Sequence, residues 1–158
     1  MELLNNDPKV LEAYSRDASL FKVTPKFVAV PKNVEEIQEL IIYAKEHGES
    51  LTVRAGGSDM TGGPLSESIV VDIKNFNQIG EVREEGTKVG PGVFYRDFEL
   101  KTLEKGLILP CYTASKNLAA LGGMVGNNCA GQMSLRYGKM ENFIVESKWL
   151  FADGKEYT

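Results

Sequence analysis

The sequence predicts an α+β fold that begins with a parallel βαβ unit. Residues 27–53 show the order strand, helix, strand, with lengths that suit a right-handed parallel crossover. Further along, turn signals at 84–86 and 153–154 lie between short segments of β character, which is typical of antiparallel hairpins. A parallel first part is therefore expected to be followed by antiparallel pairing.

Length and composition indicate one globular chain with a real core. The 158 residues are 42% hydrophobic and 25% charged, as in soluble globular proteins. The net charge of −4 gives no reason to expect nucleic acid or an anionic membrane as a partner. There is no apolar run long enough to span a membrane and no signal-peptide pattern. The two cysteines do not suggest a disulfide framework, so we expect a reduced, cytoplasmic protein.

The first half of the chain carries clear element signals. Asp7-Pro8 predicts the start of a short helix within residues 7–20, and residues 27–30 predict a strand. Asn33, with Glu36 three residues on, forms a capping-box pattern, and Gly48 closes the helix that follows. Residues 51–53 predict the next strand. The loop after this strand therefore leaves the carboxyl end of a parallel strand, where ligands collect in open α/β sheets.

The second half is predicted from shorter signals. Residues 69–73 indicate a third strand, 81–89 a hairpin, 94–105 a helix and 107–110 an extended exit. Residues 143–151 alternate between apolar and polar side chains and predict one long, half-buried strand. The chain stops a few residues after the following turn. A long strand should not find its partner so soon, so we expect this chain to be a piece of a larger protein.

A glycine-rich loop, Val53 to Gly63, is the most informative stretch. Glycine permits positive φ and close approach of a ligand, and successive N–H groups in such a turn can form a nest for an anion. Arg54 can add positive charge, and Ser58, Asp59 and Thr61 can add hydrogen bonds. The loop lacks the Gly-Lys-Ser/Thr of a Walker loop and the spacing of the dinucleotide fingerprint. A phosphate cradle and a plain connecting turn both fit this loop taken alone.

A second glycine-rich stretch, Leu121 to Gly131, favours the ligand-binding interpretation. Gly122, Gly123 and Gly126 remove side chains over one turn, while Asn127 and Asn128 tolerate left-handed backbone. A flat, extended ligand lying against bare backbone would need such a surface. The alternative is a turn that uses glycine only for packing.

Seven segments together resemble the FAD-binding domain of the vanillyl-alcohol oxidase / p-cresol methylhydroxylase superfamily (the PCMH type), in its D-lactate dehydrogenase and glycolate oxidase branch. Each segment is weakly diagnostic by itself, but they occur in the family's order and cover nearly the whole chain from about residue 14. The segments are Val28–Ile37, Arg54–Gly63, Val71–Ile73, Gly106–Leu107, Leu121–Asn128, Arg136–Gly138 and Leu150–Gly154.

The resemblance implies a two-part α+β domain with FAD between the parts. An N-terminal helical segment (1–24) would precede a βαβ subdomain (25–76) and a larger, mostly antiparallel subdomain (77–158) that is incomplete at its C-terminal end. The substrate cap domain would be absent. Substrate and electron acceptor would therefore be met by regions outside this chain, and an exposed sheet edge could support self-association. No catalytic residue and no metal ligand is expected within 1–158.

The resemblance also implies which residues contact the cofactor. The first loop would hold the diphosphate, Pro31 and Ile144 would lie near the adenine, and Ser115 with the second stretch would line the ADP and flavin side. The expected contacts are Pro31, Arg54, Ala55, Gly56, Gly57, Ser58, Asp59, Met60, Ser115, Gly122, Gly123, Val125, Gly126, Asn127 and Ile144.

Two positions bear on how FAD is held. Some relatives attach FAD covalently through a histidine in the first loop, where this chain has Ser58, so we expect non-covalent FAD. Cys111 lies near the position where doubly linked relatives attach the flavin through cysteine. Without the histidine we interpret Cys111 as a small apolar residue.

The resemblance implies a parent enzyme that oxidises a 2-hydroxy acid such as lactate or glycolate by hydride transfer to flavin N5. Two other functions stay open: a stand-alone fragment that binds a nucleotide or a partner without redox activity, and an FAD-dependent reductase of cell-wall precursor synthesis. The pattern at 121–128 and 136–138 is less like that reductase.

Overall fold

The computed structural model describes every residue from Met1 to Thr158. The chain folds into two compact units, which are described separately. The first contains residues 1–75 and 148–158, and the second contains residues 76–147. No helix in either unit is long and apolar enough to cross a membrane.

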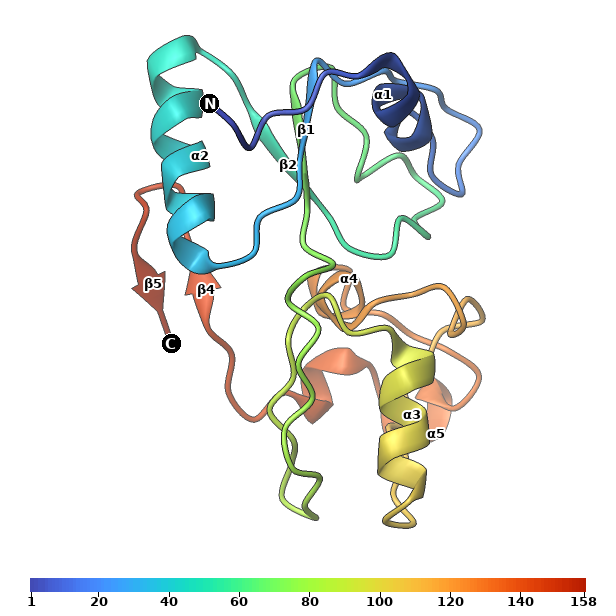
Figure 1. Cartoon of the computed structure of the whole chain (residues 1–158). Helices are drawn as coiled ribbons and strands as arrows, with labels where there is room; N and C mark the ends of the chain where they lie inside the picture. The colour runs from blue at the N-terminus through green and yellow to red at the C-terminus, as the bar shows by residue number, and fades with distance from the viewer. The chain divides into compact units, whose positions relative to one another are not determined.

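A three-stranded parallel sheet forms the centre of the first unit (Figure 1). Its strands are β1 (Phe27–Ala29), β2 (Leu51–Arg54) and β3 (Ile69–Asp72), in the order β1-β3-β2. The three predicted strands are therefore confirmed, with β3 inserted between the two strands of the βαβ unit. All four residues of β3 are buried, as expected for the central strand of a parallel sheet, and the first three, Ile69 to Val71, are apolar.

Two helices belong to this unit. The longer one, α2 (Val34–His47), begins at the predicted cap, where Asn33 accepts a hydrogen bond from the Glu36 N–H, and ends at Gly48 in left-handed conformation. It packs Leu40, Ile41 and Ala44 inward. The N-terminal helix α1 (Pro8–Tyr14) is shorter than the predicted range because Ser15 already leaves the helical ladder.

A two-stranded antiparallel sheet, β4 (Trp149–Leu150) and β5 (Glu156–Tyr157), completes the first unit (Figure 1). The predicted turn at 153–154 is confirmed, and the Gln38 side-chain amide of α2 donates to the Gly154 carbonyl over 2.8 Å. The prediction of one strand over 143–151 is wrong: only Trp149–Leu150 is strand. Residues 140–143 coil into a 3-10 turn that buries Met140. The predicted boundaries placed residues 148–158 in the second subdomain, whereas in the structure these residues group with the βαβ unit.

The second unit is built from short helices around one apolar cluster. They are α3 (Tyr95–Leu103), α4 (Leu121–Gly126), α5 (Ser134–Tyr137) and the 3-10 helix η1 (Met140–Phe143). The expected helix at 94–105 is confirmed as α3. Antiparallel pairing is limited to single bridges, of which Ile79–Val89 and Arg83–Gly86 form the predicted hairpin. Val93, Tyr95, Leu121 and Met124 lie at the centre of the cluster.

Candidate functional site

The glycine-rich loop begins where β2 ends, at the carboxyl edge of the parallel sheet, as predicted. Gly57 has φ +64°, so the chain turns there through left-handed backbone. The N–H groups of Gly56, Gly57 and Ser58 donate to no acceptor within the protein. Buried or half-buried backbone donors are normally paired, so three successive free N–H groups indicate a place for an external acceptor.

Arg54 lies over this turn. Its Nη1 donates to the Arg16 carbonyl over 2.9 Å, and its Cζ lies 5.4 Å from the centroid of the Tyr14 ring. A Cβ on Gly57 would come within 2.7 Å of the Arg54 Cζ. Glycine at 57 is therefore needed both for the positive φ and for the close approach of the guanidinium.

Asp59 acts within the loop. Its Oδ2 accepts hydrogen bonds from Thr61 Oγ1 over 2.8 Å and from the Gly63 N–H over 2.6 Å. Burial raises the pKa of the Asp59 carboxyl, but these hydrogen bonds outweigh burial and leave the pKa below its usual value. The carboxylate is thus ionised and already satisfied. If Asp59 contacts FAD as predicted, the contact would come from its backbone, because its carboxylate is already hydrogen-bonded within the loop.

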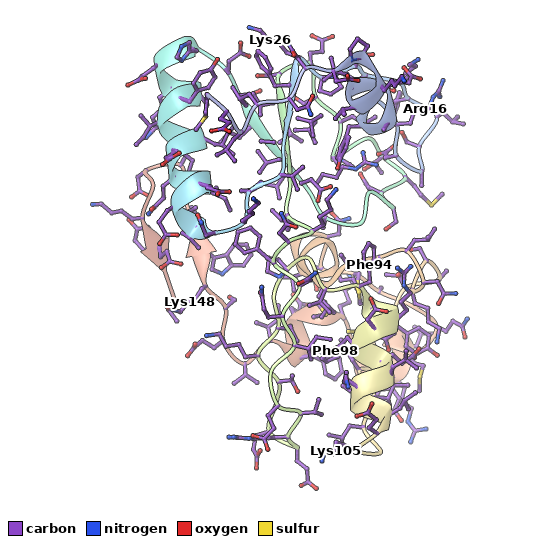
Figure 2. All side chains as sticks on the ribbon, in the orientation of Figure 1. Arg16, Lys26, Phe94, Phe98, Lys105 and Lys148 are labelled. Atoms are coloured by element: carbon purple, nitrogen blue, oxygen red, sulfur yellow. The ribbon has the colours of Figure 1, made fainter.

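The segment that follows α1 is tied to the glycine loop, which the sequence did not predict (Figure 2, with Arg16 labelled). The Arg16 carbonyl holds Arg54, the Ala18 N–H donates to the Asp59 carbonyl over 3.0 Å, and the Phe21 ring packs on Gly62. The segment is itself closed by a hydrogen bond from the Val23 N–H to the Ser15 carbonyl. The sequence signal was the irregular polar run after Tyr14, which resembles a frayed helix end.

Asp17 lies in the middle of this segment. Its Oδ1 accepts a hydrogen bond from the Ser19 N–H over 2.8 Å, while its Oδ2 is buried and has no hydrogen-bond partner. A buried oxygen without a partner is destabilising by about 1–3 kcal/mol. Because a carboxylate oxygen accepts hydrogen bonds and does not donate them, Asp17 is not a candidate contact for a phosphate.

The second glycine-rich stretch is helical, which corrects the expectation of an open turn. Leu121 and Met124 are spaced three apart and both are buried, so apolar packing favours the helix α4 over a loop. Gly122 lies against Pro91: a Cβ there would come within 2.6 Å of the Pro91 Cβ. Its N–H donates to the Pro91 carbonyl, so this amide is not free for a ligand.

The remainder of α4 stays open. Gly126 has no heavy atom within 4 Å of the position of a Cβ, and Asn127 at the end of the helix is exposed. Asn128 has positive φ, as its residue type allows, and its side chain is bonded to Glu141. Of the stretch predicted to contact FAD, the part that is exposed is therefore the C-terminal turn of α4.

The other predicted contacts are spread over both units. In the first unit Pro31 is buried after β1, and its carbonyl accepts a hydrogen bond from the Asn75 side chain. In the second unit Ser115 Oγ lies 3.0 Å from Thr113 Oγ1, and Val125 and Ile144 pack against the apolar cluster. Met60 is 77% exposed in the first loop. The predicted residues thus form two groups: Pro31 with 54–60, and Ser115 with α4 and Ile144.

The two cysteines are free and buried in the core of the second unit. The Cys129 thiol donates to the Cys111 carbonyl over 3.4 Å. Hydrogen bonding to Cys111, together with burial, raises the pKa of the Cys129 thiol. The burial of Cys111 in the apolar cluster agrees with its interpretation as a small apolar residue.

The chain is similar in sequence to a known protein family and to known proteins. The model of a family described as FAD binding domain matches residues 25–158. Glycolate oxidase subunit GlcD of Bacillus subtilis is 30% identical over 146 residues, which cover 89% of this chain and 31% of that protein. D-lactate dehydrogenase of Archaeoglobus fulgidus is 27% identical over 98% of this chain and 38% of its own length. The chain thus spans about a third of the length of these curated relatives.

The fold is shared with solved structures of lower identity. The structure of 6-hydroxy-D-nicotine oxidase from Arthrobacter nicotinovorans matches with a TM-score of 0.84 at 21% identity, over 96% of this chain and 34% of that chain. Chitooligosaccharide oxidase matches with a TM-score of 0.83 at 14% identity, over 98% of this chain and 34% of that chain. Together with the family match, this similarity shows that the chain belongs to the PCMH-type FAD-binding domain family, whose cofactor is FAD.

Proposed function

We propose that this chain is the FAD-binding part of an oxidoreductase and that it holds the FAD diphosphate on the glycine loop after β2. The observation that carries the proposal is the row of free N–H groups at Gly56, Gly57 and Ser58, with the Arg54 guanidinium beside them. Amide donors in a nest together with a guanidinium suit the oxygens of a diphosphate. FAD, when bound, supplies the hydride-accepting flavin.

The residues of the loop would divide the work of binding. The three N–H groups would donate to phosphate oxygens, and Arg54 would offset part of the diphosphate charge. Asp59 would keep the loop closed through Thr61 and Gly63, so that the donors are aligned before the ligand arrives. Such preorganisation lowers the ordering cost of binding.

We infer that FAD is bound without a covalent bond. Ser58 stands where covalently linked relatives have histidine, and its hydroxyl is not a nucleophile of comparable strength at neutral pH. Cys111 is fully buried in the core of its unit. A thiol in that position would need local unfolding to reach a flavin.

Non-covalent binding is tested by absorbance. The purified chain is mixed with FAD, excess FAD is removed by gel filtration, and the spectrum is recorded before and after denaturation. We expect the chain to retain flavin absorbance after gel filtration and to release all of the flavin on denaturation. Flavin that stays with the denatured chain would refute the non-covalent proposal, and no retained flavin would refute the binding proposal for this chain.

For the whole protein we propose oxidation of a 2-hydroxy acid to the 2-oxo acid, with hydride transfer to flavin N5. This proposal is supported by the names of relatives, which include a glycolate oxidase subunit, a D-lactate dehydrogenase and D-2-hydroxyglutarate dehydrogenases. It is tested by anaerobic addition of glycolate, D-lactate or D-2-hydroxyglutarate to the flavin-loaded whole protein. Loss of visible flavin absorbance with one of them is expected. NADPH bleaching the flavin while all three acids fail would indicate a reductase instead.

A further inference from the structure

Tyr14 is the last residue of α1 and lies before residue 25, where the match to the family model begins. Its ring is nevertheless part of the surroundings of the glycine loop, because the Arg54 Cζ lies 5.4 Å from the ring centroid. This distance is within the range of a cation–π interaction. Two residues further on, the Arg16 carbonyl accepts the Arg54 Nη1 hydrogen bond. The N-terminal segment therefore fixes the guanidinium from two sides.

The hydroxyl of Tyr14 does a separate job. It donates to the Asp72 Oδ2 over 2.5 Å at the carboxyl end of β3, and it accepts a hydrogen bond from Lys74 Nζ over 3.2 Å. Asp72 is only 6% exposed. Burial, and then the hydrogen bond to Asp72, raise the pKa of the Tyr14 phenol, which stays a neutral donor. The hydroxyl thus anchors the side chain to the sheet, and the ring is presented to Arg54.

We infer that Tyr14 is a positioning residue for FAD: its ring holds the Arg54 guanidinium against Gly57, at the free N–H groups of the loop. This inference rests on the proposed function, because it assigns a role within the same diphosphate site. An arginine that is held in place on folding loses less side-chain freedom when the anion binds. Removing the ring should therefore weaken FAD binding through Arg54 and not through the fold alone.

The test is a double-mutant cycle on the 158-residue chain, with FAD affinity measured from the change in flavin fluorescence on titration. Tyr14→Leu removes ring and hydroxyl, and Tyr14→Phe keeps the ring but loses the Asp72 hydrogen bond. Leu11→Ala in the same helix is the control for a general loss of helix packing. We expect Tyr14→Leu to raise the Kd for FAD about two- to ten-fold, the range that follows from the cost of ordering one long side chain on binding. Tyr14→Phe should raise it less, and Leu11→Ala should not raise it.

The decisive comparison is made in the background of Arg54→Met. In that background Tyr14→Leu should have little further effect on the Kd, because the guanidinium that the ring contacts is absent. An equal loss of affinity in both backgrounds, or no loss in the wild-type background, would overturn the inference while the FAD site stands. Failure of the wild-type chain to bind FAD would overturn the proposed function and this inference with it. If Tyr14→Leu does not fold, Tyr14→Met takes its place, since methionine fills irregular space.

Discussion

Replacing Gly57 by alanine probes both properties that the loop requires of this residue. Gly57 has φ +64°, and an alanine in left-handed backbone is destabilised by about 1–2 kcal/mol. The new Cβ would also lie within 2.7 Å of the Arg54 Cζ and 2.8 Å of its Nε. Because the guanidinium is the end of a flexible side chain, we expect it to move aside while the fold is kept. Gly57→Ala should therefore lower both stability and FAD affinity.

The size of each effect follows from the interaction that is lost. A hydrogen bond to a charged group contributes about 1.5–3 kcal/mol, so displacing Arg54 should raise the Kd for FAD about ten- to one-hundred-fold. Gly48→Ala is a matched control. Gly48 has φ +66° at the end of α2, and no atom lies within 4 Å of the position of its Cβ. It carries the same backbone strain without the clash with Arg54.

Both quantities are measured on the same samples, stability by urea unfolding and affinity by FAD titration. We expect the two variants to lose similar stability and only Gly57→Ala to lose affinity. Unchanged FAD affinity in Gly57→Ala would refute the view that the Arg54–Gly57 contact belongs to the binding site. An equal loss of affinity in Gly48→Ala would show that the effect comes from strain in the unit as a whole.

Two further predictions concern α4 and the loop carboxylate. Gly122→Ala should destabilise the chain by about 1–3 kcal/mol through overpacking against Pro91, whereas Gly126→Ala has free space and should stabilise it by up to about 1 kcal/mol in urea unfolding; the opposite order would contradict the packing of α4. The folded-state pKa of Asp59 is lowered, so its contribution to stability is present above about pH 4 and is lost as pH falls further. The stability difference between wild type and Asp59→Asn should thus be constant near neutral pH and shrink below about pH 4; a difference that grows on acidification would contradict the sign of this pKa shift.

The parallel half of the fold could be predicted from sequence because its signals are local and mutually consistent. Asn33 and Glu36 cap α2, Gly48 ends it, and the uninterrupted apolar run of β3 indicates a strand buried on both faces. The place of β3 between β1 and β2 could not be predicted, since strand order depends on packing between segments distant in sequence.

The second half of the fold was harder to predict from sequence because its patterns fit more than one structure. The alternation over 143–151 fits a strand, yet Met140 and Phe143 are also spaced for a helical turn, and burial of Met140 decides for the turn. In α4 the glycines suggested a loop, while Leu121 and Met124 supply a buried helical face that outweighs the low helix propensity of glycine.

The candidate site could also be predicted from sequence only in part. Glycine and arginine at the end of β2 indicated an anion site from residue type alone. The contributions of Tyr14 and Arg16 could not be found that way, because they act through a ring face and a backbone carbonyl that folding brings close to Arg54. A polar, irregular run after a helix carries no sign of what it will contact.

The most direct test of the central claim is to follow the backbone amides of the 158-residue chain by ¹H–¹⁵N NMR during titration with FAD. If the glycine loop holds the diphosphate, the amides of Gly56, Gly57 and Ser58 should show the largest shifts in the first unit, and ADP should reproduce them. The amides in the last turn of α2, which ends just before β2 begins and so lies at the opposite edge of the sheet, should move little. FAD binding that leaves the 56–58 amides unshifted would contradict the claim that this loop is the diphosphate site.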